Sequence, residues 1–267
     1  MRPGLDTEFF DLPRPRVIAH RGASGDYPEN TLPAFGAACT MGAPYFELDV
    51  HITRDGEIVV IHDDNLRRVA AHDGLIREMT MAELATVDAG RNFTRDGGRG
   101  FPFRGQGIRV PSLAEVFAAF PHQRFILEIK QTSHHLVPAM LAVIDRAKMR
   151  RRVLIASEHQ EPIDEFRALA PGIPTNLPAR EVGLFMMSLG PRAQSYVARG
   201  EALQIPPEHQ SWKLVSAESV ATAHRIGIEL QVWTVNGAAE MCEMLALGVD
   251  GILTDYPARL LDLLRAS

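Results

Sequence analysis

The sequence predicts an α/β protein that folds as a (β/α)8 barrel, or TIM barrel, with an insertion after its second strand. Short apolar runs alternate with amphipathic, helix-like segments along most of the chain, which is typical of parallel strands joined by helices. When one irregular region is left out, eight apolar runs remain, and each is followed by a helical pattern. The length of 267 residues accommodates one such barrel as a single domain over 1–267.

The barrel elements can be assigned in order along the chain. The expected strands are residues 17–20, 45–51, 124–130, 153–157, 174–177, 202–205, 229–235 and 251–253. The helices expected after them are residues 32–39, 112–120, 136–148, 161–170, 184–189, 216–225, 238–247 and 258–264. The fifth and sixth strand patterns are the weakest, so a doubly wound open sheet is the alternative. No Gly-x-Gly-x-x-Gly fingerprint follows the first strand, which favours the barrel.

Polar residues mark the starts of several expected helices. Asn30 or Thr31 can cap the first helix, and Gly42 can end it. Ser112, with Glu115 three residues later, forms a capping box at the start of the next barrel helix.

Residues 52–110, approximately, break the alternation. An apolar run at 58–61 ends at His62, a capping box begins at Thr80, and residues 95–107 are glycine-rich and basic. Strand-to-helix loops usually have about 2–6 residues, so we expect a lid or a small subdomain over the strand ends. Its aromatic side chains could line the inner face of a lid or pack onto the barrel rim: Phe93, Phe101 and Phe103.

The composition excludes several functional classes. A net charge of −5 without a long basic run argues against nucleic acid as the main partner. No run approaches the roughly 20 apolar residues of a membrane span, and residues 1–16 read as an irregular arm without a signal-peptide core. No stable membrane insertion is therefore expected. Cys39 and Cys242 lie in helix-like patterns and are expected to be buried free thiols, consistent with a cytoplasmic location.

Two carboxylates share one face of the second strand. Glu47 and Asp49 alternate with apolar residues, and side chains two positions apart on a strand point the same way, about 7 Å apart along the chain. Like charges on a buried face repel each other and lose hydration, and a divalent cation between them would remove both costs. A solvated strand end is the alternative.

The carboxyl ends of the other strands carry further polar side chains. The active site of such a barrel lies at this end, which would bring Glu128 to the first two acids. Three carboxylates form an oxygen-only ligand set, which suits Mg²⁺, Ca²⁺ or Mn²⁺ rather than zinc or copper. Glu128 and Lys130 could instead form a structural ion pair inside the barrel.

Basic and imidazole groups accompany these acids. Arg21 and Lys130 indicate an anionic substrate, and a phosphate ester fits because a metal and basic groups neutralise its non-bridging oxygens. His20 and His62 would then serve as general base and general acid. His62 could also be an ordinary loop histidine. Trp233, at a strand end, is either core or substrate wall.

Short motifs that contain these residues follow one another in a fixed order. They are His20-Arg21-Gly22, Pro28-Glu29-Asn30-Thr31, Glu47-Leu48-Asp49, His62-Asp63, Thr80 with Glu83-Leu84, Asp88-Ala89-Gly90, Pro111-Ser112-Leu113-Ala114-Glu115, Leu127-Glu128-Ile129-Lys130, Val232-Trp233-Thr234-Val235-Asn236 and the run GVDGILTDYP at 248–257. Each motif is weak alone, but their order and spacing together are highly specific. The chain resembles the glycerophosphodiester phosphodiesterases over nearly all residues after 16.

The resemblance implies divalent-metal hydrolysis of glycerophosphodiesters to sn-glycerol 3-phosphate and an alcohol on a TIM barrel. By position, the metal ligands it implies are Glu47, Asp49 and Glu128, and the acid/base pair is His20 and His62. It further implies phosphate contacts and a wall for the glycerol or head group: Arg21, Lys130 and Trp233. In the family the neighbouring glycerol hydroxyl is thought to attack phosphorus, which gives a cyclic phosphate that water opens.

One residue departs from the family pattern, and one segment bears on which substrate the chain uses. His51 stands where relatives carry another polar residue, so no role is carried over to it. Residues 202–206 (ALQIP) resemble a segment of relatives that act on lysophospholipids, which leaves hydrolysis of the lysophospholipase D type as an alternative. A sugar-phosphate lyase or isomerase, and a binding protein without turnover, are the alternatives from other classes.

Overall fold

A ring of parallel strands forms the centre of the computed structural model, which describes residues 5, 7–133, 135–189 and 196–266. The strands are β1 (Arg16–His20), β2 (Tyr45–Ile52), β4 (Arg124–Ile129), β5 (Val153–Ala156), β6 (Ala202–Ile205), β9 (Glu229–Val232) and β10 (Gly251–Thr254). They follow one another in the order β5-β4-β2-β1-β10-β9-β6, and every neighbouring pair is parallel.

Two residues close this sheet into the predicted barrel. Thr175 forms a parallel bridge with Ile155 of β5, and Asn176 forms one with Ala202 of β6. The fifth strand, expected over 174–177, is thus reduced to two bridges, but it occupies the expected place between its neighbours.

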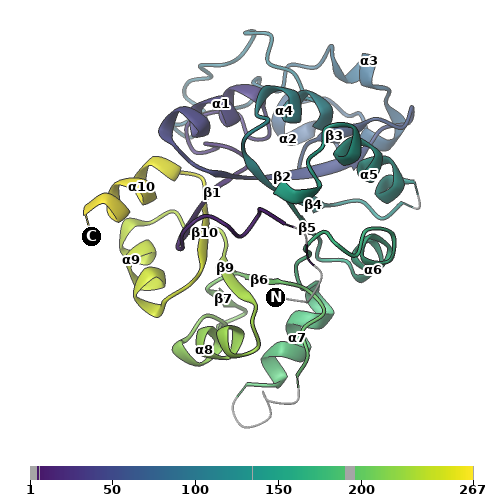
Figure 1. The fold of residues 1–267 in the computed structure, drawn as a ribbon. Coiled ribbons are helices and arrows are strands. Elements are labelled where there is room, and N and C mark those ends of the chain that lie inside the picture. The colour runs from purple at the N-terminus through teal and green to yellow at the C-terminus, as the bar shows by residue number, and fades with distance from the viewer. Residues whose placement is uncertain (1–4, 6, 134, 190–195, 267) are drawn as a thin grey trace.

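The helices surround the ring, as Figure 1 shows. They are α1 (Leu32–Met41), α4 (Leu113–Ala119), α5 (Leu136–Arg146), α6 (Gln160–Leu169), α7 (Ala179–Met187), α8 (Ala217–Arg225), α9 (Ala238–Leu247) and α10 (Pro257–Ala266), with a short 3-10 turn η2 (Arg150–Arg152). The expected alternation is confirmed. Helix α7 begins at Ala179, earlier than the expected residue 184. The sequence did not predict its first turn because a charged side chain in that turn, Glu181, is buried and accepts a hydrogen bond from Arg167 at 2.6 Å.

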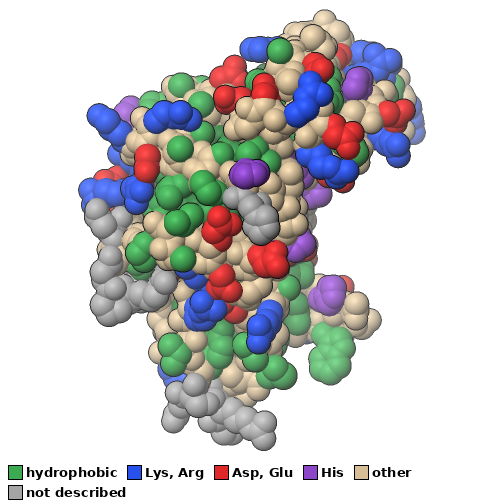
Figure 2. Space-filling model, turned by 90° about the vertical axis from the view of Figure 1, so that its right-hand side faces the viewer, with side chains coloured by type: hydrophobic (Ala, Val, Ile, Leu, Met, Phe, Trp, Pro, Cys, Tyr) green, Lys and Arg blue, Asp and Glu red, His purple; other side chains and the backbone are tan. Residues whose placement is uncertain are grey.

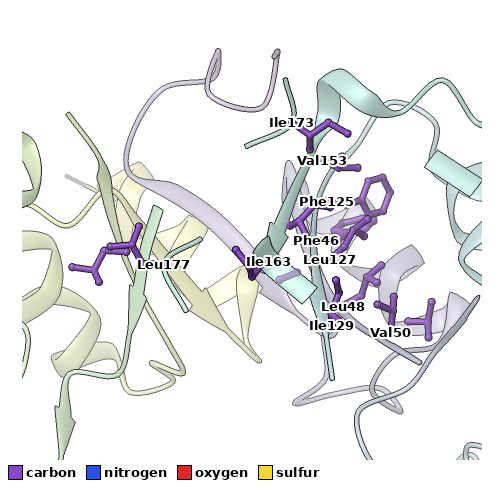
Figure 3. Close-up of a cluster of buried hydrophobic side chains, with 14 of the residues drawn as sticks. Phe46, Leu48, Val50, Phe125, Leu127, Ile129, Val153, Ile163, Ile173 and Leu177 are labelled. Carbon is purple, nitrogen blue, oxygen red and sulfur yellow. The ribbon is translucent and has the colours of Figure 1, made fainter. Parts of the chain in front are cut away.

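Side chains of β2 and β4 alternate between two hydrophobic clusters. Phe46 and Leu48 point outward to the helices, together with Phe125 of β4, as Figure 3 shows. Tyr45 and Ile126 instead belong to the cluster inside the barrel. The predicted face of β2 is therefore confirmed, β4 alternates in the same way, and the inner face is the one that carries the acids.

The insertion between β2 and α4 has a small core of its own. It holds β3 (Ile58–Val60), which pairs antiparallel with β2, then α2 (Arg67–Ala70), η1 (Ile76–Glu78) and α3 (Met81–Leu84). Its buried apolar side chains include Leu66, Ile76 and Leu84. The predicted capping box at Thr80 is confirmed. Figure 2 shows charged side chains gathered on the upper part of the molecule, which holds the insertion.

The sequence missed or misplaced several features. Strand β9 ends at Val232 rather than at 235, and a hairpin of β7 (Glu208–His209) and β8 (Trp212–Lys213) follows β6. The prediction of buried thiols was wrong: Cys39 and Cys242 are exposed, because α1 and α9 turn other residues to the core. Among the described residues, no helix combines the length and apolarity that a membrane crossing requires.

The N-terminal arm closes the barrel at the amino ends of the strands. Phe9 is fully buried in the inner cluster, although residues 1–4 and 6 of the predicted arm lie outside the described residues. The buried Arg16 guanidinium donates to Glu229 from Nε at 2.9 Å and from Nη2 at 2.6 Å, and to the Tyr45 hydroxyl at 2.8 Å. This buried, fork-shaped ion pair ties β1 to β9.

Substituting Arg16→Met is expected to lower the free energy of unfolding by about 3–5 kcal/mol, because it leaves the Glu229 carboxylate buried and unpaired. Replacing both partners, in R16M/E229M, should restore most of the loss. Arg265→Ala is the control, since its pair with Asp262 is exposed and such pairs contribute about 0–1 kcal/mol. Urea unfolding measures all variants, and equal losses in R16M and R265A would contradict the prediction.

Candidate active site

The parallel register brings the predicted acids together at the carboxyl end of the barrel. His20 of β1 lies beside Glu47 of β2, and Asp49 lies beside Glu128 of β4. These positions follow from strand pairing alone, because parallel neighbours in register present the same face to the barrel interior.

The three carboxylates form a cluster that could hold a metal ion. One oxygen each from Glu47, Asp49 and Glu128 lies within 4.8 Å of the others. Glu47 and Asp49 are buried. Their Oε1 and Oδ1 atoms accept no hydrogen bond from any described residue. Asp49 Oδ1 has one charged neighbour, Lys130 Nζ at 3.3 Å. Buried polar atoms are almost always hydrogen-bonded, so both oxygens are available to a further ligand.

Electrostatics supports the same conclusion. Burial, and next the charge of Asp49, raise the pKa of Glu47 to about 8. Burial and Asp49 likewise raise the pKa of Glu128. Burial acts in the same direction on Asp49, but the charges of Arg21 and Lys130 outweigh it and hold the pKa of Asp49 below its usual value. Full ionisation of the three carboxylates is therefore disfavoured without a further cation, and the hard, oxygen-only donor set fits a divalent cation such as Mg²⁺ or Ca²⁺.

The two predicted phosphate contacts lie next to the acids. Arg21 Nε is 3.0 Å from Asp49 Oδ2, and Arg21 Nη1 donates to Glu29 at 3.0 Å. Lys130 Nζ lies 2.7 Å from Glu128 Oε1 and 3.3 Å from Asp49 Oδ1. The structural ion pair that the sequence left open for Lys130 is thus present. It does not exclude a phosphate contact, because the ammonium carries three donors.

His20 is fixed by a hydrogen-bonded carboxylate. Its Nδ1 lies 2.7 Å from Asp255 Oδ1, and its Nε2 lies 3.9 Å from Glu47 Oε2. Asp255 also accepts hydrogen bonds from Ser24 at 2.8 Å and Asn236 at 2.6 Å. Burial lowers the pKa of His20, but the Asp255 hydrogen bond and the charge of Glu47 outweigh it and raise that pKa. This arrangement directs Nε2 toward the acids.

His62 reaches the site through the insertion. The Ile61 amide donates to the Asp49 carbonyl at 3.0 Å, which places the end of β3 beside β2. His62 Nδ1 lies 2.7 Å from Asp63 Oδ1. The His62 carbonyl bonds to His51 Nε2 at 2.9 Å, so His51, to which the sequence assigned no role, supports this loop.

Trp233 packs, half-buried, against the hydrophobic cluster inside the barrel. Its amide donates to the Ile205 carbonyl at 3.2 Å. Core packing, the alternative that the sequence left open, therefore accounts for at least part of this side chain.

Several supporting residues were missed by sequence reasoning. Asn30 donates to Asp49 Oδ2 at 2.8 Å and so fixes one metal-ligand candidate, whereas Thr31 caps α1. Asp255, Asp63 and Glu29 orient His20, His62 and Arg21, respectively. All four lie inside the motifs of the family resemblance, so a polar residue adjoining a motif's functional residue was the available signal.

Asp255→Asn is expected to lower the pKa of His20. The Asp255 hydrogen bond raises this pKa against the opposing effect of burial, so its loss leaves burial less opposed and favours the neutral imidazole. Histidine titration followed by NMR measures the shift. Asp262→Asn, which changes an exposed carboxylate, is the control and should leave the titration of His20 unchanged. An unaltered pKa in D255N would contradict the electrostatic role of Asp255.

A cavity of about 950 Å³ lies at the opposite end of the barrel, under the N-terminal arm. Most of its charged groups bind one another: Arg16 binds Glu229, and Asp250 binds Arg14 and His224. The unsatisfied carboxylates distinguish the strand-end site from this cavity.

The barrel and the acidic site at its carboxyl end define an α/β-barrel enzyme. The model of the glycerophosphoryl diester phosphodiesterase family matches residues 20–259. The chain belongs to the glycerophosphoryl diester phosphodiesterase family, and it is a phosphodiesterase of that family.

Individual relatives agree with this assignment. The chain is 32% identical to the glycerophosphodiester phosphodiesterase of Caldanaerobacter subterraneus subsp. tengcongensis, over 93% of this chain and 97% of that one. It is 28% identical to the lysophospholipase D GDPD1 of Mus musculus, over 93% of this chain and 86% of that one. Among solved structures, an Oleispira antarctica phosphodiesterase in complex with the product sn-glycerol-3-phosphate matches with a TM-score of 0.77 and 26% identity, over 94% of this chain and 97% of that one.

Proposed function

We propose that the protein is a metal-dependent hydrolase that converts glycerophosphodiesters to sn-glycerol 3-phosphate and an alcohol, with His20 and His62 as its acid/base pair. The observation that carries this proposal is the cluster of Glu47, Asp49 and Glu128, in which Glu47 Oε1 and Asp49 Oδ1 are buried and accept no hydrogen bond from any described residue. The relative that was solved with sn-glycerol-3-phosphate supports the choice of substrate class.

The metal ion would be held by Glu47, Asp49 and Glu128. When bound, it supplies Lewis-acid neutralisation of the phosphoryl oxygens. Mg²⁺ and Ca²⁺ are the first candidates and Mn²⁺ the next, since all three prefer oxygen ligands.

The chain's own groups account for binding and proton transfer. Arg21 and Lys130 hold the non-bridging phosphate oxygens, because their charges compensate the negative charge that grows there. His20 accepts the proton of the attacking hydroxyl at Nε2, since its Nδ1 is engaged by Asp255. His62 donates a proton to the oxygen that leaves phosphorus. Trp233, at the barrel mouth, forms a wall for the glycerol or head group.

The insertion of residues 52–110 is proposed to cover the site as part of one domain over 1–267. It brings His62 to the strand ends. Phe103 contacts two other rings: its centroid lies 5.4 Å from that of Phe93 and 5.5 Å from that of Tyr27, which belongs to the β1–α1 loop. The Tyr27–Phe103 contact favours packing against the rim, the second of the two arrangements considered, for Phe103 and through it for Phe93. A cytoplasmic location stays a prediction, which cell fractionation tests.

A second candidate function is hydrolysis of lysophospholipids. It is favoured by the similarity to the mouse lysophospholipase D and by the segment 202–206, which forms β6 and its exit from the barrel. The exposed Trp212 lies in the hairpin that follows β6. The acyl chain of a lysophospholipid is attached to its glycerol, and this exposed ring is an apolar contact for such a chain at the rim.

A substrate panel tests both candidates. Glycerophosphocholine, glycerophosphoethanolamine, glycerophosphoglycerol and lysophosphatidylcholine are each incubated with Mg²⁺, Mn²⁺ or Ca²⁺, and the released alcohol is quantified. Release of choline from glycerophosphocholine is expected. Release only from lysophosphatidylcholine would favour the second function, and ligand binding without any product would overturn both.

A further inference from the structure

One arginine of the insertion binds two carboxylates that each orient a different functional group. Arg68, in α2, donates from Nε to Asp63 Oδ2 at 2.8 Å. Its Nη1 and Nη2 donate to the two oxygens of Glu29 at 2.5 and 2.7 Å. We propose that Arg68 is a positioning residue, which sets the proton donor His62 through Asp63 and the phosphate contact Arg21 through Glu29. This inference rests on the proposed function, because it assigns Arg68 to that reaction.

Arg68 is connected to His62 through Asp63. Asp63 offers Oδ1 to His62 Nδ1 at 2.7 Å and Oδ2 to Arg68. A carboxylate held at both oxygens cannot rotate freely, so it fixes the plane of the imidazole and its tautomer. Nε2 of His62 is thereby left for the leaving oxygen of the substrate.

Arg68 is connected to Arg21 through Glu29. Glu29 Oε1 accepts from Arg68 Nη2 at 2.7 Å and from Arg21 Nη1 at 3.0 Å. Arg21 Nε in turn lies 3.0 Å from Asp49 Oδ2. Because the bidentate contact with Arg68 holds both oxygens of Glu29, the Arg21 guanidinium is held beside the metal-ligand candidates.

The ion pairs of Arg68 with Asp63 and Glu29 are expected to orient side chains rather than to stabilise the fold. The Arg68 side chain is 48% exposed, and exposed ion pairs contribute little to the free energy of folding. The backbone around it is nevertheless well anchored: Leu66 and Ala70 are buried in the insertion core, and Asn92 Nδ2 donates to the Arg68 carbonyl at 3.0 Å. An exposed side chain on a rigid support can define the positions of the groups it binds.

Arg67 provides a matched control within the same helix. Its guanidinium binds Asp73 at 2.7 Å, and both side chains are exposed, at 74% and 86%. Arg67→Ala therefore removes the same charge and the same side chain from the neighbouring position without touching Asp63 or Glu29.

Arg68→Ala is expected to lower kcat on glycerophosphocholine by about 10- to 100-fold, since small displacements of catalytic groups have effects of this size. The test compares this alkyl ester with the p-nitrophenyl diester of glycerol 3-phosphate. The leaving group of the p-nitrophenyl ester departs as a stable anion and needs no proton. If Arg68 acts through His62, R68A loses far more kcat on the alkyl ester than on the aryl ester. If it also acts through Arg21, KM rises on both esters.

Three further variants make the result specific. Asp63→Asn should reproduce the leaving-group dependence, and Glu29→Gln should reproduce the change in KM. A double variant R68A/D63N should lose less than the product of the single losses, because the two residues act through one contact. Added guanidinium ion should restore part of the R68A activity, and R68K should be only partly active, since one ammonium cannot replace the fork.

The outcomes separate the inference from the proposed function. R67A should match the parent enzyme in kcat and KM, and the melting temperatures of all variants show whether they are folded. If R68A behaves like R67A, or loses both esters equally without guanidinium rescue, Arg68 is not a positioning residue. If H62A itself loses as much kcat on the aryl ester as on the alkyl ester, the acid role of His62 is refuted, and with it the proposed action of Arg68 through Asp63. The KM of R68A still tests the action of Arg68 on Arg21 through Glu29.

Discussion

His20→Ala and His62→Ala are each expected to lower kcat on glycerophosphocholine by about 10²- to 10⁴-fold, the range that positioned proton transfer contributes. His20 sits between Asp255 at 2.7 Å and Glu47 at 3.9 Å. His62 enters from the insertion with Asp63 behind it. Each imidazole thus has one nitrogen fixed and the other free for the ester. Steady-state kinetics at saturating metal measures the loss.

The loss must come from chemistry and not from unfolding. Both histidines lie at the rim of the barrel rather than in its hydrophobic clusters, so the melting temperatures of the variants should remain near that of the parent protein. His122→Ala, at an exposed position, is the control for removing an imidazole. Full turnover in either H20A or H62A would refute the acid/base assignment for that residue.

The sequence predicted the barrel and the acidic cluster because both depend on short-range patterns. Alternation placed Glu47 and Asp49 on the inner face of one strand, and the strand order then brought Glu128 beside them. Fold and cluster follow from the same regularity, so a correct strand assignment delivered the three ligand candidates without further information.

The supporting contacts could not be predicted in this way, since they join segments far apart in the sequence. Asp255 reaches His20 across the β1–β10 pair, and Arg68 reaches Glu29 from the insertion. Charged residues in irregular loops carry no periodicity that shows which partner they meet. A buried charge likewise breaks the apolar pattern of α7: Glu181 is buried against Arg167, so the sequence did not predict the first turn of this helix.

Removal of the divalent cation is expected to abolish turnover. Neutralising the charge that develops on a phosphoryl group is worth several kcal/mol, which corresponds to a loss of at least about 10³-fold. Dialysis against a chelator should reduce activity to background, and adding back Mg²⁺, Mn²⁺ or Ca²⁺ should restore it to a degree that identifies the preferred ion. Activity that survives full chelation would contradict the metal-dependent mechanism.

Glu47→Gln separates the role of the metal from the stability of the site. Glu47 is buried beside Asp49, and this raises its pKa to about 8, so the metal-free fold disfavours its negative charge and loses stability as the pH rises from the ordinary carboxyl range toward that pKa. The amide has nearly the same shape without that charge. Metal-free E47Q should therefore melt at or above the temperature of the metal-free parent, yet lose activity.

The parent protein should gain stability when metal is added, by about 2.7 kcal/mol at a concentration 100 times the Kd, whereas E47Q should gain little. Thermal melts with and without each ion measure the difference, and Glu218→Gln, at an exposed position on α8, controls for the loss of one carboxylate. Equal metal-induced stabilisation of E47Q and the parent would show that the ion binds elsewhere, because a ligand stabilises a fold only through the site that holds it.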